Sequence, residues 1–347
     1  MSKAWIGSRG GAGRWMALPL AAAIAGGAWG LSAEAQEVDL TMGIIVAPGD
    51  LYSHVTGSVP ERVREATDGR VEITVSDSLV AADQIASAVR DGRLPMSAAL
   101  HTYLAAEEPR MGIFNLPDLI NDIQEYEQVR DAFWADDVAE IWLDRWNAIV
   151  LAEGAWCYNY LFSKEPIHSL EDFEGKRLRV HNPQTAALMD ALGARPTPTA
   201  VAEFIPALER GVIDGLFTSA CVANVMEVWR EAPHVQEWRL GPVTGWAILV
   251  NQDEWEALPD DLRQQIQEVM AELEAEAFGQ YEEYVERAIA EMDAAGAQIW
   301  SASEAERDRI LAPEFAEAAY ESWYARAEEL GIDGHAYIDR VRDVLGK

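Results

Sequence analysis

The 347-residue chain has few basic residues and only two cysteines, and both shortages narrow the protein classes to which it can belong. Lys and Arg number 27 against 59 Asp and Glu, a formal net charge of −32. Nucleic-acid-binding proteins need a basic surface to displace counterions, and an anionic membrane surface would repel this chain as well. Disorder is also excluded, because 49% of the residues are hydrophobic and 13 are tryptophan. Composition and length therefore predict a soluble, acidic protein of two packed domains.

The chain also lacks the short motifs that mark common catalytic and metal sites. Its 6 His are scattered, with no H-E-x-x-H motif and no Cys/His zinc spacing. A P-loop and a G-x-S-x-G elbow are absent as well. We therefore expect no enzyme activity, no metal and no cofactor. A carboxylate pair of the glycosidase kind stays open as an alternative, because acidic residues are so numerous.

Long apolar runs are confined to the N-terminus. Three basic residues precede an uncharged stretch at 15–31, and the tripeptide at 33–35 is Ala-Glu-Ala. A basic start, an apolar centre shorter than a membrane span and a small-x-small exit describe a cleavable export signal. We predict a signal peptide at 1–35 with cleavage after Ala35. The mature protein should then work in the periplasm without being embedded in a membrane.

Export would place the only two cysteines, Cys157 and Cys221, in an oxidising compartment where they could pair. Two separately buried thiols fit the sequence equally well, because spacing along the chain does not give the distance between side chains. The sequence leaves both alternatives open.

Strand and helix patterns alternate along most of the chain. Short β-rich runs occur at 38–46, 71–75, 96–100, 148–151, 176–180, 216–219 and 244–251, with helical patterns between most of them. This alternation indicates α/β layers. Apolar residues then recur every three or four positions from 262 to 292, which predicts one helix of roughly 50 Å that braces two domains.

One basic segment stands out in the acidic chain. Lys176-Arg177-Leu178-Arg179 reads as a strand, on which Arg177 and Arg179 share a face. Arg179 comes just before Asn182-Pro183, a helix start whose free N–H groups favour anions. We interpret Arg179 as a candidate carboxylate anchor. The alternative is a surface Arg paired with one of the many acids.

The segment from Ile167 to Gly215 carries a more specific pattern. It is similar, in order, to a P-I-x-x-x-x-D-L-x-G-x-K-x-R-V segment beginning at Pro166, then to ALGA-x-P and to ALQxGxVDG. Further matches at 66–70, 115–117 and 255–259 keep the same order and extend the likeness over essentially the whole mature chain. In these features the chain resembles the solute-binding subunits of TRAP (tripartite ATP-independent periplasmic) transporters of the DctP type.

The resemblance implies an α/β, two-lobe periplasmic-binding-protein fold with hinge strands and a long helix spanning both lobes. We expect lobe I to comprise 36–155 and 244–283, and lobe II to comprise 156–243 and 284–347. A ligand would then lie in the cleft between the lobes. The implied partners are the small and large membrane subunits of the TRAP permease. A secreted hydrolase using a carboxylate pair, or a ligand-sensing receptor subunit on the same fold, are the alternative functions.

By the same resemblance Arg179 grips the carboxylate of the ligand. The residues expected to approach the cleft from lobe I are Asp83, Gln84, His101 and Thr102.

The chain departs from the family pattern at two places that bear on the ligand. Tyr158 stands where many members carry a second Arg, and Leu216-Phe217-Thr218-Ser219 replaces the more usual Gln-Glu-Asn-Pro. We therefore expect a monocarboxylate with an apolar or aromatic body rather than a dicarboxylate. Trp156, Tyr158 and Phe217 would pack on that body, and Thr218 would supply a hydroxyl.

The excess of acids predicts a response to salt. Removal of residues 1–35 takes away more basic than acidic residues, so the mature chain is more acidic still. Salt screens the repulsion among these charges over about 8 Å at physiological ionic strength and over less in brine. We expect the Tm of the mature protein to rise steadily with NaCl in a thermal melt. A Tm that stays constant or falls would contradict adaptation to salt.

Overall fold

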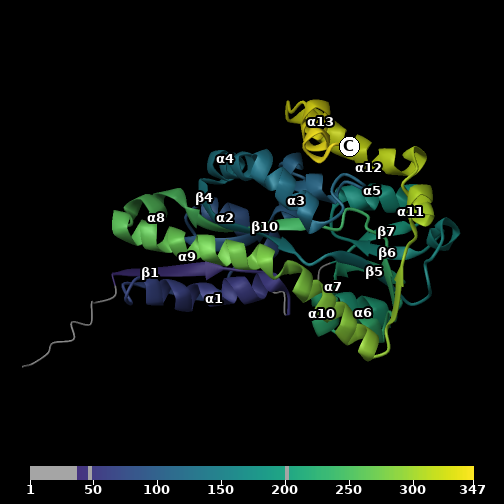
Figure 1. The fold of residues 1–347 in the computed structure, drawn as a ribbon, viewed down its shortest axis with the longest axis horizontal. Coiled ribbons are helices and arrows are strands. Elements are labelled where there is room, and N and C mark those ends of the chain that lie inside the picture. Colours follow the sequence, from purple (N-terminus) through teal and green to yellow (C-terminus); the bar gives the residue numbers. More distant parts are fainter. Residues whose placement is uncertain (1–36, 46–48, 200–202) are drawn as a thin grey trace, which may run out of the picture. The chain divides into compact units, whose positions relative to one another are not determined.

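The computed structural model describes residues 37–45, 49–199 and 203–347, and it places their strands in two mixed β-sheets (Figure 1). The predicted signal peptide and its cleavage site lie outside the described residues. The strand order is β2-β1-β3-β10-β4 in the first sheet and β11-β9-β5-β8-β6-β7 in the second. Helices precede and follow most strands, so the α/β layers predicted from the alternating patterns are confirmed.

The two sheets combine parallel and antiparallel neighbours. In the first sheet, β1 is parallel to β2 and β3, whereas β10 is antiparallel to β3 and β4. In the second, β6 is parallel to β7 and β8, whereas β5 is antiparallel to β8 and β9. The strands of the first sheet are β1 (Val38–Gly43), β2 (Val71–Ser76), β3 (Met96–Leu100), β4 (Ala148–Trp156) and β10 (Thr244–Asn251). Those of the second are β5 (Asn159–Ser163), β6 (Arg177–Val180), β7 (Arg195–Pro198), β8 (Gly215–Ser219), β9 (His234–Glu237) and β11 (Gln298–Ser301).

The α-helices differ in length from one turn or two to about five turns. In chain order they are α1 (Leu51–Ala66), α2 (Ile85–Arg90), α3 (Ile123–Val129), α4 (Ala135–Trp146), α5 (Pro183–Ala191), α6 (Phe204–Glu209), α7 (Ala220–Val225), α8 (Gln252–Ala257), α9 (Asp260–Gly279), α10 (Tyr281–Ala294), α11 (Glu304–Ile310), α12 (Pro313–Glu329) and α13 (Gly334–Leu345). Two short turns also matter for the site, η1 (Ala82–Gln84) and η2 (His101–Leu104). No helix among the described residues has both the length and the apolar composition that a membrane crossing requires.

The chain passes between the two sheets at three places. β4 of the first sheet leads through two residues into β5 of the second, and β9 of the second leads back into β10 of the first. The third passage is helical, because α9 packs against α1 and β4 whereas α10 packs against α7 and β11 (Figure 1). These are the hinge strands and the bridging helix that the sequence predicted.

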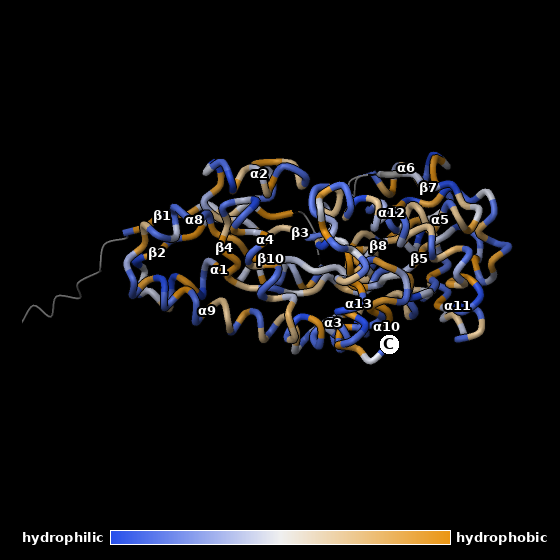
Figure 2. Tube along the Cα trace, turned by 90° about the horizontal axis from the view of Figure 1, so that it is seen from above, coloured by the Kyte–Doolittle hydropathy of each residue, from blue (hydrophilic) through white to orange (hydrophobic). Residues whose placement is uncertain are grey.

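The bridging helix differs in one detail from the single helix predicted between 262 and 292. It is divided at Gln280, whose φ of −101° and ψ of −1° depart from the ideal values of an α-helix. The bonds from Gln280 N to Glu276 O (3.0 Å) and from Tyr284 N to Gln280 O (3.1 Å) nevertheless continue the helical pattern. The preceding Gly279 has a low helix propensity and adds no side chain that would resist a bend. In Figure 2 hydrophilic and hydrophobic residues alternate along α9, consistent with one solvated and one buried face.

Cys157 and Cys221 form a disulfide, which decides between the two alternatives that the sequence left open. The bond ties the short connection between β4 and β5 to α7, and the Cα atoms lie 6.0 Å apart. It therefore fastens one of the three passages between the sheets to a helix of the second sheet.

Loss of this disulfide should destabilise the protein without unfolding it. The cross-link closes a loop with a sequence separation of 64 residues. For a loop of that length the chain-entropy model gives about 4 kcal/mol of stabilisation. We expect the free energy of unfolding in urea to fall by roughly that amount when a reductant is added. The Cys157→Ala/Cys221→Ala double variant is the matched control, and its stability should no longer respond to the reductant.

Candidate functional site

Arg179 lies at the carboxyl end of β6 with its guanidinium among buried groups. β6 is held between β7 and β8, with Arg179 opposite Thr197 on one side and Leu216 on the other. Asn182 follows as the N-cap of α5 and accepts a hydrogen bond from Thr185 N (2.7 Å), so the predicted helix start is present. Only 4% of the Arg179 surface is exposed. The strand β6 thus places the positively charged side chain of Arg179 in the interior of the protein.

The Arg179 guanidinium is bound by neutral groups only. Its Nε donates to Thr199 O (2.9 Å) and its Nη1 donates to Phe217 O (2.8 Å). The ring centroid of Phe204 lies 4.4 Å from the guanidinium carbon. Among the described residues no carboxylate lies within 4.0 Å of it, so the surface ion pair considered from the sequence is not formed. Burial lowers the pKa of Arg179 to about 10, which leaves it positively charged at neutral pH.

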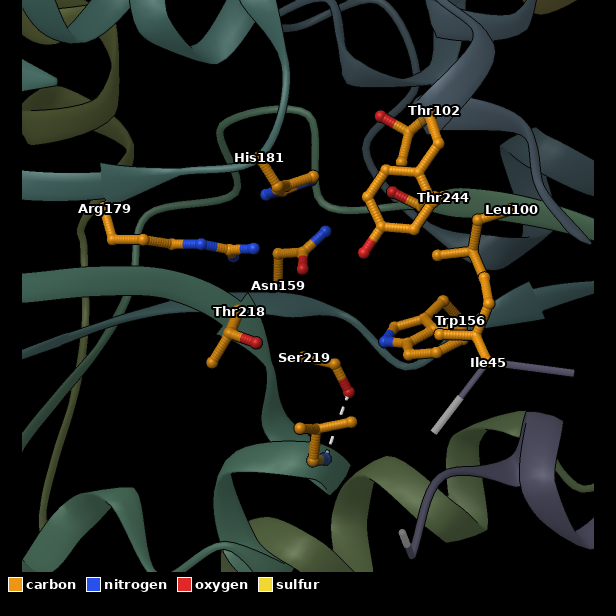
Figure 3. A pocket seen from close by; sticks show the side chains of 12 residues that line it. Ile45, Leu100, Thr102, Trp156, Asn159, Arg179, His181, Thr218, Ser219 and Thr244 are labelled. Carbon is orange, nitrogen blue, oxygen red and sulfur yellow. Dashed lines mark hydrogen bonds between the residues drawn. The ribbon is translucent and has the colours of Figure 1, made fainter. Parts of the chain in front are cut away.

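A pocket opens beside this guanidinium. Its wall comes from the ends of strands in both sheets, and Figure 3 shows Arg179 pointing toward Asn159 and His181 with Trp156 on the far side. The lining residues are Ile45, Leu100, Thr102, Tyr103, Trp156, Asn159, Arg179, His181, Thr218, Ser219, Val222 and Thr244. No Asp or Glu belongs to this set, although the chain as a whole is strongly acidic.

Among the described residues that line the pocket, Arg179 is the single cation at neutral pH. The other basic candidate, His181, is half-buried, and its Nδ1 has no hydrogen-bond partner among the described residues. Burial and the neighbouring Arg179 charge lower the pKa of His181 to about 3, so its ring is neutral. A neutral imidazole offers one donor and one acceptor rather than a second charge.

The pocket continues outward into a wider, more acidic mouth. Arg179, Tyr103 and His181 line both parts. The mouth adds Asp77 and Asp83 from the segment after β2, together with apolar residues and Glu203. A compact anion that reaches Arg179 therefore first passes the acidic side chains of the mouth. Among the described residues of the inner pocket, Arg179 carries the only formal charge.

The family model for bacterial extracellular solute-binding protein, family 7 (DctP), matches residues 42–326. This chain belongs to that family. The C4-dicarboxylate-binding periplasmic protein DctP of Rhodobacter capsulatus is 25% identical over 276 residues, 76% of this chain and 79% of the relative.

Solved structures of TRAP solute-binding proteins share the two-lobe fold. A marine metagenome protein described as specific for pyroglutamate has a TM-score of 0.78 at 23% identity and covers 89% of this chain and 99% of its own. A Desulfovibrio salexigens protein with bound orotic acid has a TM-score of 0.79 at 19% identity, covering 88% and 99%. The family resemblance and the fold class predicted from the sequence are therefore confirmed.

Five of the nine residues predicted for the site of this solute-binding protein lie at the pocket or its mouth. Arg179, Trp156, Thr102 and Thr218 line the pocket, and Asp83 lines the mouth. Arg179, Thr102 and Asp83 were expected from the family resemblance, and Trp156 and Thr218 from the departures of this chain from the family pattern.

Tyr158 does not reach the pocket, so its predicted placement is corrected. Its hydroxyl donates to Glu282 Oε1 (3.0 Å) and accepts from Ile123 N (2.8 Å), away from Arg179. The prediction followed the family pattern, in which many members carry an Arg at this position. β4 ends at Trp156, the disulfide-bonded Cys157 follows, and the alternation of faces begins afresh in β5. Asn159, the first residue of β5, faces the pocket in its place.

Phe217, His101 and Gln84 are also placed outside the pocket lining. Phe217 precedes Thr218 in β8 and so takes the other face of the strand, and only its carbonyl contacts Arg179. His101 is fully buried, with its ring centroid 5.8 Å from that of Trp134. Gln84 is an exposed residue of η1 that lines neither the pocket nor its mouth.

Sequence reasoning missed several residues of the lining. Ser219 immediately follows Thr218, and His181 lies two residues after Arg179, so proximity to predicted site residues was an available signal. Tyr103 likewise follows Thr102. Thr244 begins a strand predicted at 244–251, but nothing in that run indicated that its first residue would lie opposite Trp156.

The burial of His101 generates a prediction about pH. Burial lowers its pKa from 6.5 to about 3, and neither ring nitrogen has a partner among the described residues. The unfolded chain therefore binds a proton in this window that the folded chain does not, so stability falls as the pH is lowered through it. His101→Gln should remove up to about 1.4 kcal/mol per pH unit from this slope.

Urea unfolding at several pH values within the window measures that slope. His335→Gln is the matched control, because His335 is exposed on α13 and its replacement should leave the slope unchanged. Equal slopes for His101→Gln and the unaltered protein would contradict the prediction.

Proposed function

We propose that this protein captures a small organic monocarboxylate between its two lobes and delivers it to the membrane subunits of a TRAP permease. The observation that carries the proposal is the buried Arg179 guanidinium, which faces the pocket without a carboxylate partner among the described residues. Leaving such a charge unpaired is costly unless an anion completes the site. A carboxylate can accept two parallel hydrogen bonds from one guanidinium.

The pocket favours one carboxyl group on a compact body. Arg179 is the only cation at neutral pH among the described lining residues, so a second carboxylate would be buried without a cationic partner there. Trp156 and Tyr103 offer aromatic surface on the side away from β6. Pyroglutamate and orotate, named for the marine metagenome and Desulfovibrio proteins, are ring compounds with a single carboxyl group. We infer that a ring compound with a single carboxyl group suits the charge and the aromatic lining of the present pocket.

The division into lobes follows from the same proposal. We assign 36–155 and 244–283 to lobe I and 156–243 and 284–347 to lobe II, with residues 1–35 acting as the export signal. The three passages between the sheets would then be the hinge about which the cleft closes. Closure would exclude water and strengthen the pairing of Arg179 with a carboxylate by lowering the local dielectric.

Arg179→Ala should weaken binding of a monocarboxylate by about a hundredfold or more, because it removes a buried partner of a charged ligand. A thermal-shift panel first identifies the ligand among pyroglutamate, orotate, aromatic monocarboxylates and small dicarboxylates. Isothermal titration then compares the variants. The fold should persist, because the Arg179 side chain bonds only to two backbone carbonyls.

Arg177→Ala is the matched control for this substitution. Arg177 lies on the same strand but pairs with Asp214 (2.5 Å), so its loss should leave ligand affinity within a few-fold of the original value. Unchanged binding by Arg179→Ala, or stabilisation by dicarboxylates alone, would refute the proposal. Delivery is tested separately, by co-purification of the protein with a membrane permease rather than with a receptor kinase.

A further inference from the structure

Two hydroxyl groups of the pocket wall direct their only proton toward buried groups behind the wall. Ser219 Oγ donates to Asp50 Oδ2 (2.8 Å), and Thr102 Oγ1 donates to Asn115 Oδ1 (3.0 Å). Asp50 and Asn115 are 1% and 2% exposed and do not line the pocket themselves. A hydroxyl has one proton and two lone pairs. A hydroxyl whose proton is committed elsewhere presents only an acceptor to a ligand.

The direction of the bond between Ser219 and Asp50 follows from the other partners of Asp50. Its carboxylate caps α1 by accepting from Tyr52 N (3.1 Å), and it also accepts from the backbone of Cys157. Burial raises the pKa of Asp50 to about 6, so the group is ionised at neutral pH and can only accept. Ser219 must therefore donate. Its oxygen accepts from Val222 N (3.3 Å), the dashed line in Figure 3, and one lone pair stays available.

The direction of the bond between Thr102 and Asn115 follows from a backbone carbonyl. Asn115 Nδ2 donates to Val243 O (3.2 Å), and a carbonyl oxygen can only accept. The amide oxygen of Asn115 therefore faces Thr102, which has to donate. The same Nδ2 donates to Thr244 Oγ1 (3.0 Å), so the proton of Thr244 remains free to point into the pocket.

We propose that Asp50 and Asn115 are positioning residues that select organic acids carrying a hydrogen-bond donor, a hydroxyl or an amide N–H, besides the carboxylate bound by Arg179. This inference rests on the proposed function and specifies its ligand class. Thr102 follows β3 of the first sheet and Ser219 ends β8 of the second, so acceptors face the ligand from both sides. An organic acid with an acceptor atom facing Thr102 or Ser219 would bring its lone pairs against those of the hydroxyl oxygen, and neither acceptor would have a donor in the buried site.

Two matched ligand pairs test the selection on the mature protein with its disulfide intact. The first is L-pyroglutamate and 5-oxotetrahydrofuran-2-carboxylate, in which a ring oxygen replaces the N–H. The second is mandelate and α-fluorophenylacetate, in which fluorine replaces the hydroxyl. Isothermal titration at neutral pH should show the donor-bearing acid of a pair binding about tenfold tighter or more, because mismatch leaves a buried acceptor unpaired. Equal affinities, or tighter binding of the analogue, overturn the inference.

The Asp50→Asn variant tests whether Asp50 sets the preference for donor-bearing acids, because a residue with only a structural role would leave that preference unchanged. The amide oxygen of Asn would keep the bonds from Tyr52 and Cys157, so its NH₂ group would face Ser219. Ser219 would then accept and turn its own proton into the pocket. We expect the preference for the donor-bearing acid to disappear or to reverse. Retention of the full preference by a folded Asp50→Asn variant overturns the role of Asp50.

Ser219→Ala and Thr218→Val form a matched pair of pocket variants. Ser219→Ala removes the oriented acceptor and should reduce the donor preference. Thr218 lines the same pocket, but its hydroxyl has no hydrogen-bond partner among the described residues. Thr218→Val should therefore change the affinities for both members of a pair alike and keep their ratio.

A measurement without ligand separates this inference from the proposed function. Carbon-13 NMR follows the titration of the Asp50 carboxyl in the unaltered protein and in Ser219→Ala. The Ser219 hydrogen bond lowers the pKa of Asp50, so its loss should raise that pKa above about 6. An unchanged pKa overturns the inference even if no ligand is found. Failure of every carboxylate to bind refutes the proposed function, whereas binding through Arg179 without donor preference refutes only the inference.

Discussion

A guanidinium buried without a carboxylate partner is the constraint on which the rest of this structure depends. The chain carries 59 acidic residues, and most Arg side chains of its surface lie beside one of them. Arg179 does not, because two backbone carbonyls and the Phe204 ring surround it instead. These neutral groups hold the side chain in place and leave its charge uncompensated. The described residues that line the inner pocket include no Asp or Glu, so no lining carboxylate compensates the charge of Arg179.

The same few segments support both the fold and the pocket. Trp156 and Asn159 flank the short connection in which Cys157 forms its disulfide, while Ser219 and Val222 flank Cys221. Asp50 adds a buried hydrogen bond between the start of α1 and the end of β8 at this place. The positions of the ligand-facing side chains are therefore set by covalent and polar ties that also join the two sheets. Precise placement of that kind limits the conformational entropy lost on binding.

Local patterns predicted much of this arrangement. The run at 244–251 became β10 with those limits, and the Asn182-Pro183 signal became the start of α5. Arg179 was identifiable because its strand, the helix start after it and the family motif agreed. The position of Tyr158 could not be predicted in this way, because no residue pattern indicated that β4 ends at Trp156. The alternation of side chains between the two faces starts again in β5. His101 was misplaced for a related reason, since the aromatic residues that enclose it lie more than thirty positions further along the chain.

The sequence by itself determined the α/β class, the family and the strong acidity, and it predicted Arg179 as the anchor for an anion. These properties depend on composition, short-range periodicity and an extended motif, all of which are readable along the chain. The tertiary structure alone decided that the two cysteines pair, that Asn159 rather than Tyr158 faces the pocket, and that Ser219 and Thr102 present acceptors. Each of these three features depends on which backbone and side-chain groups from distant parts of the chain contact the residue. The direction of a hydrogen bond and the formation of a disulfide depend on contacts between residues that are distant in the sequence, and spacing along the chain does not give these contacts.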